Sequence, residues 1–188
     1  MKLIKILIPC MLLSACFGTS QNAKFYTPSA ISTQPLSSSY TAFVGVNRIQ
    51  LPKYMDRPQM VTQRKNSARV DISEYNRWVE APSVLATRTL TENLSVLLPT
   101  ARIKMNQIKG EGFDCTISVE ISKWSAVLGN QAELVAWYTI KNNSGKALTQ
   151  QKFTSTVPVG NTYDNLAQVY SELLEQLSQE IAATLIKK

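Results

Sequence analysis

The chain has 188 residues, 44% of them hydrophobic, and a formal net charge of +7 from 20 Lys and Arg against 13 Asp and Glu. This composition supports a packed core and excludes wholesale disorder, and the length suits one domain of ordinary size. The sequence contains no histidine, which removes the commonest general base and zinc ligand. Because no metal-ligand spacing or close acidic pair replaces it, we expect neither an enzyme nor a bound cofactor.

The first sixteen residues have the layout of a secretory signal that ends in a lipid-attachment cysteine. A positively charged start precedes an apolar run over 3–13, and Leu13-Ser14-Ala15-Cys16 places small residues before the thiol. The apolar run is shorter than the roughly twenty residues that a membrane-spanning helix needs. The sequence therefore resembles a bacterial lipoprotein with a signal peptide over 1–15.

In such a protein Cys16 carries a covalent N-acyl diacylglyceryl group, and this lipid is the only modification that we expect. Phe17 follows the cysteine, where lipoproteins retained in the inner membrane commonly have Asp. We therefore expect anchoring in the outer membrane, on its periplasmic face. Cys10 leaves with the signal peptide, so Cys115 is the one remaining thiol and no intramolecular disulfide can form. Its alternating surroundings predict a buried, inert thiol.

Residues 16–39 are rich in Ser, Thr, Gln, Asn and Pro, which predicts a lipidated N terminus and a flexible tether. A first strand is expected near 24–28, and residues 40–188 are expected to form one globular domain. In the first half of that domain the patterns predict a strand over 41–50 and a hairpin with strands over 61–63 and 68–72. A connecting segment over 75–82 and a helix over 83–98 are expected to follow.

The second half of the chain predicts a short strand, an antiparallel meander and a long helix. The strands are expected over 101–105, 115–128, 133–141 and 148–157, and the turns between the last three contain Gly and Asn. Asn161 offers a cap for a helix that continues to the carboxyl end with an unbroken apolar stripe. The expected fold is α+β, a largely antiparallel sheet with two long helices packed on one face.

The segment Leu51-Pro52-Lys53-Tyr54-Met55-Asp56-Arg57-Pro58-Gln59-Met60-Val61-Thr62 is the second distinctive stretch of the sequence. It is a proline-bracketed loop that leads into a strand, and Pro58 favours extended geometry at Arg57. The candidate site residues in it are Leu51, Pro52, Tyr54, Asp56, Arg57, Pro58 and Gln59. Two interpretations stay open: a rigid corner tied by side chain to backbone hydrogen bonds, or a surface for a partner.

This segment is similar to the L-P-x-Y-L-D-R-P-Q-I-V-T signature of the PqiC/YmbA-type family, the auxiliary lipoproteins of ABC-type and MCE lipid-transport systems. The order of lipid-attachment cysteine, tether, strand, motif, hairpin and Arg77-Trp78 matches that family as well. Glu80-Ala81-Pro82 has one residue more than the family pattern, and the half after Ile103 matches only in layout. The resemblance implies a non-catalytic, outer-membrane component that engages an MCE-domain tunnel protein and assembles into a homo-oligomeric ring.

An alternative is a lipid- or small-ligand-binding envelope lipoprotein that acts alone. In that case Trp124, Trp137 and Tyr138 lie on strands that line a groove, although core packing also explains them. Apart from two small groups, Arg64-Lys65 with Arg69 and Lys187-Lys188, the basic residues are scattered, which predicts a solvated basic face. Export makes nucleic acid an improbable partner.

Overall fold

The computed structural model describes residues 21–107 and 111–187. Along this part of the chain, eight strands and two helices follow one another as β1 (Lys24–Tyr26), β2 (Phe43–Val46), β3 (Gln59–Gln63), β4 (Val70–Trp78), α1 (Pro82–Leu97), β5 (Arg102–Met105), β6 (Cys115–Val127), β7 (Gln131–Asn142), β8 (Ala147–Pro158) and α2 (Tyr163–Ile186). The α+β class is confirmed. Neither described helix combines the length and the apolar content that spanning a bilayer requires.

The larger sheet has the strand order β5-β2-β6-β7-β8 and is mixed. The meander β6-β7-β8 is antiparallel, as the sequence predicts, because short turns join these strands. In contrast, β2 runs parallel to both β5 and β6, so the sheet is not purely antiparallel. The cause is a crossover: α1 returns the chain across the sheet before β5 begins.

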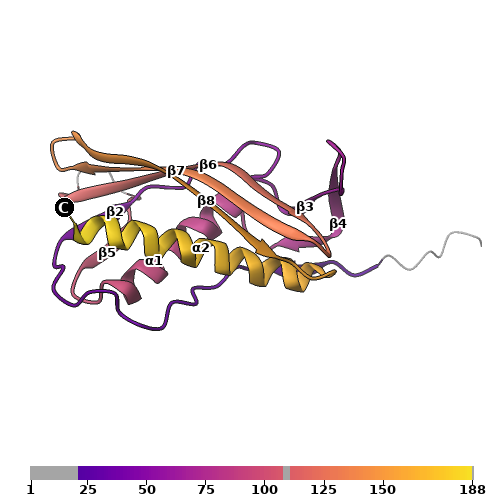
Figure 1. Ribbon diagram of the computed structural model, residues 1–188, viewed down its shortest axis with the longest axis horizontal. Helices are drawn as coiled ribbons and strands as arrows, with labels where there is room; N and C mark the ends of the chain where they lie inside the picture. The colour runs from indigo at the N-terminus through magenta and orange to yellow at the C-terminus, as the bar shows by residue number, and fades with distance from the viewer. Residues whose placement is uncertain (1–20, 108–110, 188) are drawn as a thin grey trace, which may run out of the picture.

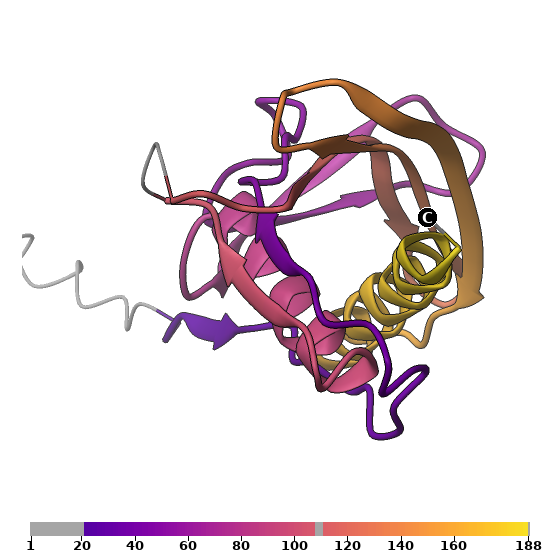
Figure 2. The same ribbon diagram turned by 90° about the vertical axis from the view of Figure 1, so that its left-hand side faces the viewer.

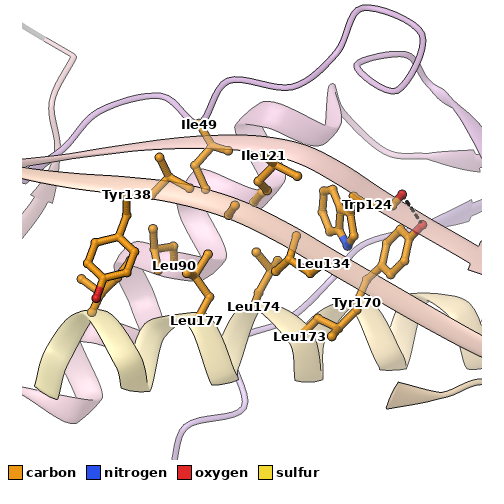
Figure 3. Packing of buried hydrophobic residues seen from close by; sticks show 14 of the residues in the cluster. Ile49, Leu90, Ile121, Trp124, Leu134, Tyr138, Tyr170, Leu173, Leu174 and Leu177 are labelled. Atoms are coloured by element: carbon orange, nitrogen blue, oxygen red, sulfur yellow. Dashed lines mark hydrogen bonds between the residues drawn. The ribbon is translucent and has the colours of Figure 1, made fainter. Parts of the chain in front are cut away.

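Both helices cover one face of this sheet, and the sheet curves around them when it is viewed along the long axis (Figures 1 and 2). The predicted apolar stripe of α2 is buried against β6 and β7, where Leu173, Leu174 and Leu177 meet the inward side chains (Figure 3). A bulge between Ile121 and Lys123 shifts the alternation of β6 by one residue. As a result Trp124, not Lys123, points into the core.

A smaller sheet has the order β1-β4-β3. Its strand β4 extends through residues 75–78, which the sequence analysis assigned to a connecting segment, and that prediction is wrong. The additional strand residues pair with β1 in parallel, Phe25 lying opposite Arg77 and Tyr26 opposite Trp78. Because the residues that pair here are about fifty positions apart, no local sequence pattern indicates that residues 75–78 belong to a strand.

The chain between β1 and β2 lies across the outer side of both helices. The Ser29 amide donates to Ser171 Oγ at 3.0 Å, and the Ile31 and Ser32 amides both donate to Asn93 Oδ1 at 3.0 Å. These bonds attach part of the expected tether range to the body of the protein. Residues 16–20, including the predicted lipid site, lie outside the described residues.

Candidate functional site

The 51–62 segment forms a tight corner between β2 and β3. The amides of Met55 and Asp56 donate to the carbonyl of Pro52 at 2.8 and 3.1 Å, which closes the first turn. At the other end, the amide of Trp78 donates to the carbonyl of Pro58 at 2.6 Å. Each bracketing proline therefore supplies a backbone acceptor, and the corner is held to itself and to β4.

Asp56 caps helix α1 from outside the helix. The N-cap residue Ala81 has no side-chain acceptor, and α1 has no acidic residue in its first turn. The Asp56 carboxylate replaces both, because it accepts from the Ser83 amide at 3.0 Å and from Ser83 Oγ at 2.9 Å. Arg48 donates to the same Ser83 Oγ from Nη2 at 2.7 Å and lies 3.7 Å from Asp56 Oδ2. For this residue the structure supports the rigid-corner interpretation.

A second, buried tie runs beside this cap. Thr87 Oγ1 accepts from the Ile49 amide at 2.9 Å and donates to the Ser83 carbonyl at 2.6 Å. The hydroxyl thereby satisfies a backbone donor three residues after β2 that would otherwise be buried without a partner. Sequence reasoning missed Thr87 and Ser83, although two hydroxyl residues spaced four apart on a buried helix face are a visible signal.

The remaining motif residues divide into packed and exposed groups. Leu51 packs against the core, and Gln59 lies in β3 opposite Arg77. Tyr54 is 48% exposed, whereas Arg57 is half-buried and its Nε lacks a hydrogen-bond partner among the described residues. The motif thus combines an inward corner built on Asp56 with an outward side that presents Tyr54.

A shallow groove of about 430 Å³ adjoins this outward side. Tyr54 and Met55 contribute from the motif, Val70 from the hairpin and Lys123 from β6, and Trp124 also lines it. The groove has one cation and several apolar walls. No cluster of three or more Cys, Asp or Glu side chains accompanies it in the described part of the chain.

The three aromatic residues considered as a ligand groove do not come together. Tyr138 is fully buried, with its hydroxyl 2.8 Å from Thr184 Oγ1, and Trp124 is buried as well. Trp137 directly precedes Tyr138 on β7 and points to the opposite face of the sheet, where it is 44% exposed. Core packing, the alternative explanation, is the correct one for Trp124 and Tyr138.

Tyr170 of α2 joins the two sheets through an aromatic stack that the sequence analysis did not anticipate. Its ring lies 4.5 Å from that of Trp124 in β6 and 5.7 Å from that of Trp78 in β4. The Tyr170 hydroxyl donates to the Trp124 carbonyl at 3.1 Å (Figure 3). Burial raises the pKa of this phenol above its ordinary value. The stack fixes β4, and with it the motif corner, against the core.

Cys115 is buried, as predicted, at the start of β6. Its Sγ lies 3.8 Å from the Tyr40 hydroxyl. Burial raises the pKa of the thiol above its ordinary value, and the hydrogen bond with Tyr40 offsets only part of that effect. The environment therefore favours the protonated thiol over the reactive thiolate.

These features define an α+β protein whose distinctive motif orders a corner beside an open groove. The chain belongs to the family of ABC-type transport auxiliary lipoprotein components, whose model matches residues 26–182. No curated protein sequence matches it.

Solved structures support the fold. A protein described only as uncharacterized aligns with a TM-score of 0.73 at 17% identity, over 88% of this chain and 99% of its own. A DUF330-family protein from Xanthomonas campestris aligns with a TM-score of 0.71 at 14% identity, over 87% of this chain and 95% of its own. A PelC dodecamer from Paraburkholderia phytofirmans reaches only 0.40 at 11% identity, over 78% and 93%, which supports no inference about assembly.

Proposed function

We propose that this protein is a non-catalytic auxiliary lipoprotein of an MCE/ABC-type intermembrane lipid-transport system, anchored in the outer membrane and facing the periplasm. The observation that carries the proposal is family membership over residues 26–182, which describes a transport auxiliary component. The lipid-attachment signature at Leu13-Ser14-Ala15-Cys16 adds the anchor. No observation favours the alternative of a ligand-binding lipoprotein that acts alone.

The anchor is tested by fractionating cells that express Cys16→Ala. A second version, residues 17–188 behind an ordinary cleavable signal peptide, controls for retention by an unprocessed signal. We expect the unmodified protein in the outer membrane. The second version lacks the lipid that attaches the protein to the membrane, so we expect it in the soluble periplasmic fraction. Recovery of that version in the outer membrane would remove the anchoring role of Cys16.

The partner is tested by site-specific photocrosslinking in cells. A photoreactive residue at Tyr54 lies at the groove beside the motif, and one at Leu148, which is exposed to a similar degree, serves as the matched control. We expect an adduct with an MCE-domain protein from Tyr54 that is absent from Leu148. The same adduct from both positions, or from neither, would contradict the assignment of this groove to the MCE partner.

We also propose that the chain assembles into a homo-oligomeric ring. Strand β8 forms one edge of the larger sheet, and in the described chain no strand pairs with its free side. Such an edge has the backbone groups needed to pair with another chain. Native mass spectrometry of the detergent-solubilised lipoprotein is expected to give one closed multiple of the monomer mass, and a monomer alone would contradict the ring.

A further inference from the structure

The smaller sheet has one face on the protein body and one face in solvent. Met60, Thr62 and Trp78 point inward and are buried. The register places Val70 opposite Gln63 and Ile72 opposite Val61, on the other face from the buried Thr62. Val70 and Ile72 are accordingly exposed apolar side chains on the solvent face of the strand, and Val70 also borders the groove beside Tyr54.

The same outward face continues at the other end of β4. Phe25 pairs with Arg77, so these two side chains share a face, and Val79 follows Arg77 by two positions. Trp78, between them, points inward to the stack on Tyr170. Phe25 is 62% exposed and Val79 is 50% exposed, which are the two largest values among the exposed large hydrophobic side chains of the described residues. Monomeric proteins rarely leave such a concentration uncovered without a role for it.

This sheet and its turn are also basic. They contain five cationic side chains and two acidic ones, a net charge of +3, namely Lys24, Arg64, Lys65, Arg69 and Arg77 against Asp71 and Glu74. Asp71 is shared by Arg64 at 3.4 Å and Arg69 at 2.9 Å, so one carboxylate meets two guanidinium groups. Lys65 and Arg77 form no ion pair in the described chain. Lys24 lies on the other face from Phe25, but Arg77 is on the outward face and the turn adds three more cations. This end of the protein thus has excess positive charge, which suits an anionic surface.

The smaller sheet lies close to the expected lipid anchor, which indicates that the anionic surface is a membrane. Strand β1 is itself part of the sheet, and its first residue, Lys24, is eight residues after Cys16. Eight residues reach at most about 29 Å even when fully extended. The described chain begins at the end of the long axis that carries β3 and β4, and its C terminus lies at the opposite end (Figure 1).

From this geometry we propose that the outward face of the β1-β4-β3 sheet is a second membrane contact, which lies on anionic phospholipid next to the lipidated Cys16. The inference rests on the proposed lipid anchor. Phe25, Ile72 and Val79 enter the interface between headgroups and acyl chains, and the basic side chains meet the phosphates. The contact orients the molecule, so that the β7–β8 turn and the end of α2 point away from the bilayer.

The test measures the bilayer depth of one added tryptophan in the lipidated, full-length protein. Trp137→Phe removes the exposed native indole, and Phe25→Trp or Leu148→Trp is added to that background. The proteins are reconstituted in vesicles of phosphatidylethanolamine and phosphatidylglycerol that carry bromine on the upper acyl chain. We expect bromine to quench the fluorescence of the Phe25→Trp variant strongly. The fluorescence of the matched Leu148→Trp variant should be quenched no more than that of the Trp137→Phe background, in which only the buried Trp78 and Trp124 remain.

A second measurement isolates the face from the anchor. Residues 17–188, without lipid, are titrated with the same vesicles and with vesicles of phosphatidylcholine alone. We expect weak binding to the anionic vesicles only, reduced about tenfold by Phe25→Ser, because an apolar side chain leaves the interface. Leu148→Ser, at the opposite end, is expected to leave binding unchanged.

The outcomes distinguish the proposed membrane contact from the proposed lipid anchor. Lipidated protein that floats with the vesicles while neither tryptophan reporter is quenched overturns the membrane contact and leaves the anchor intact. Failure of the lipidated protein to float overturns the anchor. A Phe25→Trp signal that changes with protein concentration in the absence of vesicles identifies a second copy of the chain on this face, which also overturns the membrane contact.

Discussion

Asp56 shows how one motif residue sets the start of a distant helix. Helix α1 begins after Ala81, a poor cap, and the Asp56 carboxylate accepts both the amide and the hydroxyl of Ser83. We expect Asp56→Ala to lower the free energy of unfolding by about 1–2 kcal/mol, the usual effect of losing a helix cap. Urea denaturation followed by circular dichroism measures this difference.

Asp164 provides the matched control, because it lies in the first turn of α2 and that helix already has a cap. There the hydroxyl of Thr162, one residue after the predicted Asn161, accepts from the Asn165 amide at 3.2 Å. Asp164→Ala should therefore cost only the helix-dipole interaction, at most about 1 kcal/mol. Equal losses at both positions would show that Asp56 acts through its charge alone and not as a cap.

Cys115 makes stability depend on alkaline pH. Burial raises the pKa of its thiol above the ordinary value in the folded protein, so the unfolded chain loses this proton at a lower pH. Its contribution is complete below the unfolded pKa and is lost as the pH rises above about 8.5, the ordinary pKa of a thiol. We expect urea midpoints to fall above that pH, and to fall less steeply in Cys115→Ser.

Tyr40, whose hydroxyl lies beside the Cys115 thiol, also affects stability at alkaline pH. Burial and the neighbouring thiol raise the pKa of its phenol, so it weakens the fold in the same direction at still higher pH. A Tyr40→Phe variant separates the two groups, because it keeps the packing and removes the phenol. Identical pH profiles for the unmodified protein and Cys115→Ser would mean that the thiol does not contribute.

At the scale of elements, one buried side chain supplies two of the hydrogen bonds that attach the segment between β1 and β2. Asn93 is fully buried in α1, and its Oδ1 accepts from the amides of Ile31 and Ser32. We expect Asn93→Ala to leave two backbone donors unsatisfied and to release the segment locally. Hydrogen exchange at residues 29–37 should accelerate, while exchange in β6 and β7 should stay slow.

The polar residue Asn143, exposed in the β7–β8 turn, offers a control substitution of the same type. Asn143→Ala should leave exchange at residues 29–37 unchanged. If Asn93→Ala accelerates exchange uniformly across the sheet, the segment is not a separate unit, and Asn93 supports the fold as a whole.

The elements that sequence reasoning predicted are those with a local signal. The stripe of α2 and the alternation of β6 and β7 each repeat along the chain, and the Gly and Asn turns mark where strands reverse. The parallel pairing of β2 with β6 and of β1 with β4 depends on contacts distant in sequence, so no periodicity reveals it. The motif was recognised, but the role of Asp56 required the position of Ser83.

At the scale of the molecule, two sheets and a helix meet at Tyr170. Its ring is stacked between Trp78 of the smaller sheet and Trp124 of the larger one. The predicted stripe of α2 included Tyr170, but neither tryptophan has a sequence relation to it. The stack therefore makes the orientation of the smaller sheet, and of the motif corner bonded to it, depend on the packing of α2.

This dependence yields a graded prediction. Tyr170→Phe keeps both ring contacts and removes only the hydrogen bond to the Trp124 carbonyl, so we expect a loss of about 1 kcal/mol in the free energy of unfolding. Tyr170→Ala removes the ring as well and should cost about 3–5 kcal/mol, as for other buried aromatic residues. If the stack couples the sheets, the fluorescence of Trp78 should change at lower urea than the helical signal in Tyr170→Ala, with Trp124→Phe and Trp137→Phe in the background. Coincident transitions in that variant would show that the smaller sheet is held by its other contacts, such as those of β3 with β6.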